Sequence, residues 1–559
     1  MSMKVGIDFR GDWSEFLDES AGPECPRWLS GDRLNIARLC FQGERGREAI
    51  VQRDERGHDR TITLGELERL SGRVAGGLKN RGLRPGDAVG ILLPMTIEAV
   101  AAILGIILAG GVVVGIPESF APPEIETRLK LGRARWIITQ DSIHRRGSKI
   151  PLRAKLDACD PLSIITIGNP PEGDIVWADF LGPDEPFEAV ARDPSDHAII
   201  LFSSGTTGRP KAIPWTHTTP IKCAVDGFLY QDIQLDDLVA WPSSPGWMMG
   251  PWLIFATLMN GATIGLFDGH PGSREFCRFV ADWGVTTLGV VPSLVAAWRA
   301  GGMTDGLDWS EIRRFSSTGE CSNPNDMFWL MSRAGYKPVI EYCGGTEIGG
   351  GYLTSHPLAP NAPGFFNTVA FGLEMVILDP EGQPADRGEA FLIGPSIGLS
   401  TELIDGDHHA VYYEGTPKLP GKGPLRRHGD QVERLPGGFY RVLGRVDDTM
   451  NLGGIKVAAV EIERVLNLHP IVRESAAVTE HDPSGGPERL VAYLVLQEGS
   501  APSKDLKAEL QALLSKNLNP LFRLGEVAIT DALPRTASQK VMRRLLRDRP
   551  APDLPKGGG

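Results

Sequence analysis

The strongest chemical signal in this sequence is a stretch of glycines and hydroxyl residues that ends in a lysine. Residues 201–211 read LFSSGTTGRPK. Glycines let a backbone bend close to a ligand, while hydroxyls, exposed N–H groups and a lysine attract phosphate oxygens. The common phosphate loop, GxxxxGK[ST], is absent. A linker is the alternative, but the apolar run at residues 198–202 reads as a buried strand, so strand, loop and lysine favour a phosphate-binding cradle.

Four further groups of segments place acidic, basic or hydroxyl residues in glycine-rich surroundings. They are STGE at 317–320, EYCGGTE at 341–347, HGD at 428–430, and a C-terminal group made of LGRVDD at 443–448, GGIK at 453–456 and LPRTASQK at 533–540. These segments matter in combination with the glycine loop, through their order and spacing along the chain.

The bulk composition limits the functions that these segments can serve. At 559 residues the chain exceeds the roughly 250–300 at which one core stops growing, so we expect at least two domains. The net charge of −12 argues against nucleic acid as a partner. Seven scattered cysteines without a CxxC predict a reducing compartment and no disulfide or metal framework. With no signal-like N-terminus and no SKL-type C-terminus, we expect a cytoplasmic protein.

Alternating elements must position these loops. Apolar spacing predicts a helix over 63–81, with Thr63 and Glu66 as a capping box. Residues 99–116 carry no charge, but a Gly-Gly pair divides them, so we expect a buried helix at 97–109 and a strand at 112–116 rather than a membrane span. Strands at 89–93, 136–139 and 164–167 continue the alternation, which is typical of a parallel sheet with helices on both faces.

A second round of strands and helices covers residues 236–345, and the ligand of such lobes lies at the strand ends. Beyond 365, expected strands at 369–378 and 388–394 indicate a small β region. We therefore predict an α/β protein: an N-terminal domain, 1–446, of two doubly wound lobes plus a small β-barrel-like region. A small, mobile α+β domain, 447–559, follows it.

Taken together and in this order, the motifs resemble the adenylate-forming enzymes, which comprise acyl-CoA synthetases, peptide-synthetase adenylation domains and luciferases. The resemblance covers about residues 28–547, and WLSGDRLN at 28–35 is similar to the entry segment of the acetyl-CoA synthetase branch. It implies that a carboxylate attacks the α-phosphate of ATP to give an acyl-adenylate and pyrophosphate. The thiol of coenzyme A then releases AMP. ATP, Mg²⁺ and coenzyme A are implied, with no tightly bound organic cofactor.

The resemblance also implies a role for each motif residue. The β- and γ-phosphates would lie against Ser203, Ser204, Gly205, Thr206, Thr207, Gly208 and Lys211. Thr346 would bind the α-phosphate, Glu347 would ligate Mg²⁺, and Asp430 would accept the ribose hydroxyls, with Arg445 on ribose or phosphate. The adenine pocket would comprise Thr318, Gly319, Glu320, Cys321, Tyr342, Cys343, Gly344 and Gly345. Cys343 stands where the family has a stacking aromatic, so either Tyr342 reaches the base from one position earlier or stacking is weaker.

Acetate-specific relatives close the acyl pocket with a tryptophan where this chain has Gly344. We therefore expect space for an acid larger than acetate, short- to medium-chain, hydroxy or compact aryl. The pocket would be lined by Trp247, Met248, Met249, Thr318 and Gly344.

The C-terminal domain is expected to rotate about Asp447 between the half-reactions. Lys540 would bridge the carboxylate and the α-phosphate during adenylation, although Gln539 replaces the usual glycine before it. Lys456 would serve thioester formation. Coenzyme A would bind Arg145, Arg146, Lys149, Gly453 and Gly454, and His469 matches a position linked to a structural cation.

Structural alternatives stand beside these roles. They are a surface acid for Glu347, turn aspartates for Asp430 and Asp447, a surface ion pair for Arg445, a solvated helix face for Lys540, a basic surface loop for 145–149 and a helix-end histidine for His469. Two other functions remain open: loading of a carrier-protein phosphopantetheine, and a nucleotide-binding protein without catalysis.

Overall fold

The computed structural model describes residues 16–160, 163–204, 210–446, 449–452, 455–480, 489–518, 522–535 and 541–547. The chain divides into two compact units, which are described separately. Unit 1 comprises Met1–Met375 and Leu392–Arg426, and unit 2 comprises Val376–Phe391 and Arg427–Gly559. The predicted boundary between residues 446 and 447 stays a prediction.

The first sheet of unit 1 has seven strands in the order β11-β10-β7-β5-β6-β12-β13. Its strands are β5 (Ala88–Leu92), β6 (Val112–Gly115), β7 (Ala134–Gln140), β10 (Ser163–Ile167), β11 (Ile175–Val176), β12 (His197–Ser204) and β13 (Pro210–Thr216). All neighbours are parallel except β12 and β13, which form an antiparallel hairpin at one edge. The predicted parallel sheet is therefore confirmed, and the hairpin is the element that carries the glycine loop.

The second sheet has nine strands in the order β20-β19-β18-β17-β16-β14-β15-β3-β4. They are β3 (Glu48–Asp54), β4 (Asp59–Thr63), β14 (Leu238–Ala240), β15 (Thr263–Asp268), β16 (Thr287–Val290), β17 (Arg314–Ser317), β18 (Val339–Gly345), β19 (Gly350–Thr354) and β20 (Thr368–Val369). The six central strands, β18, β17, β16, β14, β15 and β3, run parallel to one another. At the two edges, β4, β19 and β20 add antiparallel pairs. The carboxyl ends of β16, β17 and β18 thus share one edge.

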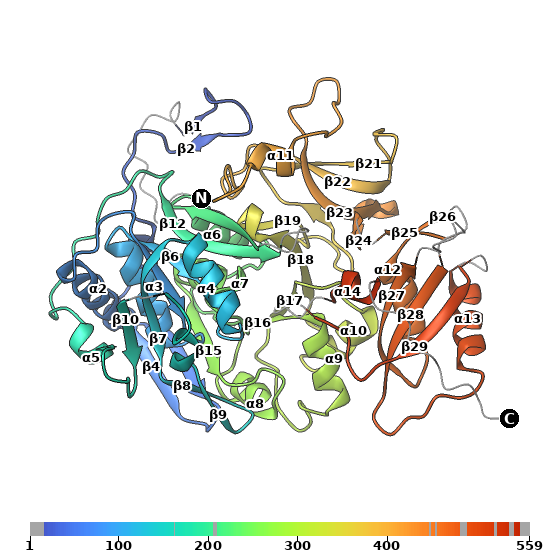
Figure 1. The fold of residues 1–559 in the computed structure, drawn as a ribbon, viewed down its shortest axis with the longest axis horizontal. Helices are drawn as coiled ribbons and strands as arrows, with labels where there is room; N and C mark the ends of the chain where they lie inside the picture. Colours follow the sequence, from blue (N-terminus) through green and yellow to red (C-terminus); the bar gives the residue numbers. More distant parts are fainter. Residues whose placement is uncertain are drawn as a thin grey trace. The chain divides into compact units, whose positions relative to one another are not determined.

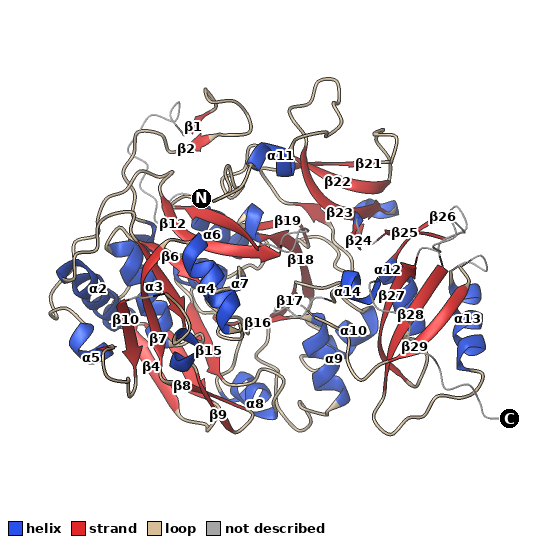
Figure 2. Cartoon of the chain, in the orientation of Figure 1, coloured by secondary structure: helices blue, strands red, loops and turns tan. Residues whose placement is uncertain are grey.

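Helices cover both sheets (Figures 1 and 2). They are α2 (Leu64–Asn80), α3 (Ile97–Leu108), α4 (Pro122–Leu131), α5 (Trp177–Phe180), α6 (Thr219–Leu229), α7 (Met249–Leu258), α8 (Arg274–Asp282), α9 (Pro292–Ala300), α10 (Pro324–Ser332) and α11 (His408–Tyr412). Side chains of α2, α3, α6 and α7 join residues of both sheets in one large core, and α8, α9 and α10 cover the other side of the second sheet. Because α3 lies inside that shared core, it is apolar all round.

The smaller elements of unit 1 are a short N-terminal hairpin, a second hairpin and three 3₁₀ turns. The hairpins are β1 (Leu17–Asp18) with β2 (Arg27–Trp28), and β8 (Ser142–Arg145) with β9 (Ser148–Pro151). The 3₁₀ turns are η2 (Ile36–Phe41), η3 (Arg153–Leu156) and η4 (Thr346–Ile348). Among the described residues no helix combines the length and apolar character needed to cross a bilayer.

A four-stranded sheet in the order β21-β22-β23-β24 forms the small β region, most of it in unit 2. Its strands are β21 (Glu374–Leu378), β22 (Arg387–Ile393), β23 (Arg426–Arg434) and β24 (Tyr440–Arg445), with the 3₁₀ turn η5 (Pro436–Gly438) between the last two. The single strand predicted at 369–378 is wrong, because the chain turns at Gly372, whose φ is +82°, and separates β20 from β21.

The rest of unit 2 is an α+β arrangement, as predicted. Its elements are β25 (Thr449–Leu452), β26 (Ile455–Ala458), α12 (Ala459–Leu466), β27 (Val472–Glu480), β28 (Arg489–Leu496), α13 (Leu506–Asn517), β29 (Leu524–Ile529) and α14 (Arg543–Arg547). The last three strands form a sheet in the order β27-β28-β29, with apolar side chains of α12 and α13 packed on it.

Candidate active site

The β12–β13 hairpin places a hydroxyl opposite a lysine. In its antiparallel register Ser203 pairs with Lys211 and Ser204 pairs with Pro210. The register therefore holds the two ends of the predicted phosphate cradle side by side. Of the predicted loop, Gly205, Thr206, Thr207 and Gly208 lie outside the described residues, and of Ser204 only the backbone is described.

A second loop carries Glu347 to the same place. The Ser203 hydroxyl donates to the Glu347 carboxylate over 2.9 Å, and the Lys211 Nζ lies 4.0 Å from the same oxygen. The Glu347 side chain is 16% exposed and that of Lys211 is 28% exposed, so both groups lie in a half-buried site that solvent reaches. A hydroxyl, an ammonium and a carboxylate from two predicted motifs are thus in contact within unit 1.

Main-chain contacts fix the turn η4, which carries Thr346 and Glu347 between β18 and β19. The indole N–H of Trp215 donates to the Thr346 oxygen over 2.8 Å, and the Ser400 N–H donates to the Glu347 oxygen over 2.9 Å. Gly349 ends the turn with a φ of +64°, in the left-handed region that favours glycine. Sequence reasoning missed Trp215 and Ser400, because neither belongs to a glycine-rich motif.

The ring of Tyr412 is a further residue that sequence reasoning missed. The Lys211 Nζ lies 5.4 Å from the centre of that ring, and the Arg426 guanidinium lies 4.0 Å from it. The aromatic face is therefore shared between two cations, an arrangement that favours positive charge near the hairpin. In the sequence, two tyrosines at 412–413 and two arginines at 426–427 are the pattern that could have indicated this contact.

The predicted adenine segment follows the carboxyl end of β17. The Thr318 hydroxyl donates to the Tyr342 main-chain oxygen over 2.5 Å, which ties this segment to β18. Gly319 has a φ of +92°. Glu320 turns away and accepts hydrogen bonds from the N–H and hydroxyl of Ser293 in the first turn of α9. Cys321 and Cys343 are both half-buried.

A buried carboxyl group, Glu341, supports this segment from beneath. It accepts hydrogen bonds from the Ser322 hydroxyl over 2.7 Å and from the Gly364 N–H over 2.8 Å. Glu341 is 3% exposed, and burial raises its pKa from 4.5 to about 7 despite these two bonds. The Ser322 hydroxyl in turn shares a hydrogen bond with that of Ser317, so a single carboxyl group anchors the end of β17 and the Gly364 loop.

Of the two alternatives for the stacking position, the structure contradicts the one in which Tyr342 reaches the base. Its side chain is 1% exposed and lies in the core, where its hydroxyl donates to Asp226 over 2.5 Å and accepts from the Trp252 indole over 3.1 Å. Successive residues of a strand point to opposite faces, so Cys343 points away from Tyr342. The Cys343 sulfur lies 3.6 Å from the Tyr352 hydroxyl.

The opening expected at Gly344 is also corrected. A Cβ placed there would lie 1.9 Å from the Gly350 oxygen, because β19 runs against it at the bulge between Cys343 and Gly344. The absent side chain therefore makes room for a strand rather than for substrate. The next glycine, Gly345, pairs with Gly350 in the same hairpin.

The remaining predicted acyl residues share one segment. Trp247, Met248 and Met249 are half-buried and lead into α7, and the Trp247 ring packs edge-on against Phe120, with ring centres 5.5 Å apart. A Cβ at Gly246 would lie 2.2 Å from the Pro117 nitrogen, so the segment packs closely on the main chain that follows β6. Flexible methionines thus stand on a rigid support.

The predicted coenzyme A cations lie on the β8–β9 hairpin, and the structure separates their roles. Arg145 donates to Asp268 over 2.8 Å, with Glu118 at 3.5 Å, so two carboxylates offset its charge, and its role in binding coenzyme A stays a prediction. Arg146 begins the turn with a φ of +54°, is exposed, and bonds to the His270 ring over 2.8 Å. Lys149 is exposed on β9.

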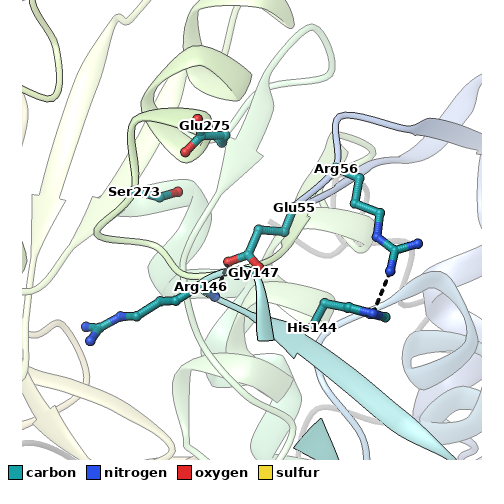
Figure 3. A pocket seen from close by; sticks show the side chains of 7 residues that line it. All are labelled: Glu55, Arg56, His144, Arg146, Gly147, Ser273 and Glu275. Atoms are coloured by element: carbon teal, nitrogen blue, oxygen red, sulfur yellow. Dashed lines mark hydrogen bonds between the residues drawn. The ribbon is translucent and has the colours of Figure 1, made fainter. Parts of the chain in front are cut away.

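A cavity of about 300 Å³ opens beside this hairpin (Figure 3). It is lined by Glu55, Arg56, His144, Arg146, Gly147, Ser273 and Glu275. Figure 3 shows Arg56 and His144 joined on one side, while Arg146 reaches away from them. Glu55 lies between and accepts from the N–H groups of Arg146 and Gly147, which fixes the turn.

Unit 2 holds the ribose candidates. Asp430 on β23 pairs with Arg445 on β24, and their side chains meet at 3.1 Å. The His428 Nε2 lies 3.1 Å from the other Asp430 oxygen. Asp430 is 8% exposed, whereas the Arg445 side chain is 48% exposed. Gly429 has a φ of +84°, in the left-handed region that favours glycine, and a Cβ there would have to displace the tip of the Arg445 guanidinium.

The roles predicted for several residues of unit 2 stay predictions. Asp447, Gly453, Gly454 and Lys540 lie outside the described residues, and of Lys456 only the backbone on β26 is described. The His469 ring bonds to Glu509 over 2.9 Å, and no cluster of metal-binding side chains occurs among the described residues. The structure thus favours the helix-end histidine over a cation site.

Comparisons with known proteins identify the family of this chain. Residues 40–398 match the family of AMP-binding enzymes, and residues 461–540 match the AMP-binding enzyme C-terminal domain. The chain is 44% identical over 96% of its length to the probable acyl-activating enzyme 17, peroxisomal, of Arabidopsis thaliana, covering 80% of that protein. It is also 44% identical over 95% of its length to a hexanoyl-CoA synthase of Cannabis sativa, covering 78% of that protein.

The fold is similar to that of solved structures. An acetoacetyl-CoA synthetase from Streptomyces lividans superposes with a TM-score of 0.88 at 24% identity, over 98% of this chain and 88% of that one. The predictions of the fold and of acid–CoA ligase activity with ATP and coenzyme A as substrates are thereby confirmed. The chain belongs to the family of AMP-binding enzymes, the adenylate-forming enzymes that its motifs predicted.

Proposed function

We propose that this acid–CoA ligase activates a linear acid of medium chain length, of about the size of hexanoate. The likeness to a hexanoyl-CoA synthase supports this size, as do the two methionines at the start of α7, whose side chains adapt to flexible chains. The observation that carries the adenylating step is the contact of Ser203 and Lys211 with Glu347.

In the adenylating step, the hairpin and the turn would hold ATP from two sides. Lys211 would offset phosphate charge, and Thr346 would bind the α-phosphate near the attacking carboxylate. Glu347 and the Ser203 hydroxyl offer hard oxygen atoms of the kind that Mg²⁺ prefers, and these oxygens lie 2.9 Å apart. When bound, Mg²⁺ would neutralise charge that develops on the leaving pyrophosphate. Catalysis would consist mainly of positioning and charge stabilisation.

Unit 2 would contribute residues to both steps. We infer that Asp430 holds the ribose, that Lys540 serves adenylation, and that rotation about Asp447 then brings Lys456 and the glycine pair 453–454 to the pantetheine thiol. Arg146 and Lys149 are exposed cations suited to the phosphates of coenzyme A, while Arg145 supports their hairpin from behind. This basic hairpin favours free coenzyme A over a carrier protein as the acceptor.

The test is an ATP–pyrophosphate exchange screen over acids from acetate to octanoate, with hydroxy and aryl acids included. Exchange is expected to peak near six carbons, and coenzyme A should outperform a holo-carrier protein as thiol acceptor. A peak at acetate or at an aryl acid would contradict the proposed substrate. A cytoplasmic location remains a prediction, which cell fractionation tests.

A further inference from the structure

A buried ion pair lies beneath the turn that carries Thr346 and Glu347. Lys222 and Asp226 stand one turn apart on α6 and pair with each other, their side chains 3% and 0% exposed. Removing two charges from water costs several kcal/mol, which the pair regains only with good geometry and further hydrogen bonds. A buried ion pair in this position is therefore weak evidence for a role in stability, and its contacts with the turn indicate what else it does.

The free energy cost is offset by contacts with both strands that flank the turn. One Asp226 oxygen accepts from the Tyr342 hydroxyl over 2.5 Å and from the Gly351 N–H over 2.9 Å. Tyr342 belongs to β18 and Gly351 to β19, so a single carboxylate oxygen holds both arms of the hairpin. The Trp252 indole donates to the same Tyr342 hydroxyl over 3.1 Å and fixes its position.

Two glycines, one directly after the turn and one in a later loop, are close-packed against this ion pair. A Cβ at Gly350 would lie 2.4 Å from Asp226, and one at Gly398 would lie 2.7 Å from Lys222. The Cys223 sulfur, also on α6, donates to the Gly349 oxygen over 3.3 Å. The backbone from 349 to 351 therefore rests directly on α6.

We propose that Asp226, compensated by Lys222 and bonded to Tyr342, is a positioning residue that sets the place of Thr346 and Glu347 relative to Ser203 and Lys211. It touches neither ATP nor acid and acts through the β18–β19 hairpin. The inference rests on the proposed function, because it assigns Asp226 to the adenylating step rather than to thioester formation.

The test compares the two half-reactions in Asp226→Ala. ATP–pyrophosphate exchange should fall on the order of a hundredfold, because small misplacements of a catalytic group have effects of this size. Thioester formation from synthetic hexanoyl-AMP and coenzyme A should fall far less, because pyrophosphate departure is already complete. As a readout independent of turnover, the rise in Tm caused by MgATP should shrink, since it reports binding to the folded state.

Two further variants separate positioning from folding. In Lys222→Met with Asp226→Asn, the amide oxygen still accepts from Tyr342 and Gly351 while both charges are gone, so exchange should recover relative to Asp226→Ala. Tyr342→Phe keeps the Gly351 bond and the packing of the ring, and should give an intermediate loss of exchange in a folded protein.

A second buried pair supplies the matched control. Arg314 donates to Asp237 over 2.9 Å, and the Asp237 side chain is fully buried. This pair lies at the amino ends of β14 and β17, whereas the candidate site lies at their carboxyl ends. Asp237→Asn should lower Tm without separating the two half-reactions and without reducing the MgATP-dependent shift.

Equal losses of both half-reactions in Asp226→Ala and Tyr342→Phe would overturn the inference, and so would a loss of exchange in Asp237→Asn as large as that in Asp226→Ala. Failure of the proposed function looks different, since the wild-type protein would then show no acid-dependent exchange. In that case the MgATP-dependent Tm shifts of the same variants still decide the positioning role.

Discussion

The indole N–H of Trp215 donates a hydrogen bond to the main-chain oxygen of Thr346 over 2.8 Å. Trp215 lies on β13, four residues after Lys211, and is 1% exposed. The strand that presents the lysine is thus bonded to the turn that presents Glu347, the proposed Mg²⁺ ligand. Two motifs that lie 135 residues apart in the sequence (211 and 346) therefore share one support.

Trp215→Phe tests that support. The change leaves the Thr346 oxygen without its donor and should lower the free energy of unfolding by about 1–3 kcal/mol, measured by urea denaturation. Exchange activity should fall beyond what the lost stability explains. Trp309→Phe is the control, because Trp309 is equally buried and donates to the Cys277 oxygen over 3.0 Å. Equal activity in the two variants would contradict a special role for Trp215.

Glu347→Gln should abolish most exchange, on the order of a hundredfold or more, because an amide is a poor Mg²⁺ ligand. Ser203→Ala removes only the hydroxyl that contacts Glu347 and should cost less. The concentration of Mg²⁺ needed for half-maximal exchange, measured at saturating ATP, should rise in both. An unchanged Mg²⁺ requirement in Glu347→Gln would exclude it as the ligand.

Glu341 predicts a pH-dependent stability. Its pKa is about 7 in the folded chain, against 4.5 for an ordinary glutamate, so between these pH values the folded state binds the extra proton. The free energy of unfolding should therefore fall as pH rises from 4.5 to 7, by about 3 kcal/mol in total from this group, and level off above pH 7. Denaturation curves at several pH values measure the slope.

The matched variants isolate this contribution. In Glu341→Gln the amide can accept from Gly364 and donate to Ser322 at every pH, so this part of the slope should disappear and stability at pH 8 should exceed that of wild type. Glu44→Gln makes the same change on an exposed residue and should leave the slope unaltered. A wild-type slope in Glu341→Gln would refute the assignment.

Asp430→Ala should raise KM for ATP by about ten- to a hundredfold, because losing the proposed hydrogen bonds from the ribose hydroxyls to this carboxylate costs about 1.5–3 kcal/mol in total. Steady-state exchange at varied ATP measures the effect. Glu433→Gln is the control on the same hairpin, where Glu433 pairs with Arg441. An ATP KM that changes equally in both variants would make Asp430 a structural residue.

The two lysines should separate the half-reactions. Lys540→Ala is expected to lose exchange but to keep thioester formation from preformed acyl-adenylate, because its charge serves only the first transition state. Lys456→Ala should show the reverse pattern. Normal acid-dependent exchange in Lys540→Ala would show that another group serves adenylation.

Sequence patterns predicted the local elements well. The Thr63 and Glu66 capping box starts α2 as expected, and the apolar stretch that resembled a membrane span is α3 followed by β6. These elements follow from short-range spacing and capping, which are local properties of the chain. The motif order predicted the family because glycine and charged residues at fixed spacing carry chemistry as well as structure.

The features that sequence reasoning missed share a physical origin in contacts between distant segments. Nothing near Tyr342 indicates that its hydroxyl bonds to Asp226, which lies 116 residues earlier. Nothing near Arg145 indicates the partner Asp268, 123 residues later. Similarly, β3 pairs with β15 in the second sheet although the two strands lie far apart in the sequence, and the sequence near either strand does not indicate its partner. The direction in which a side chain points and the partners of its charge could therefore be determined only from the folded structure.

The register of the β12–β13 hairpin has a practical consequence. Because Ser204 pairs with Pro210, the five residues from 205 to 209 join two strands whose ends are already fixed. Loop segments from relatives could thus be grafted at these five positions while Ser203 and Lys211 keep their places on the two strands. The hairpin would serve as a cassette in which the proposed contacts to the β- and γ-phosphates are varied apart from the fold.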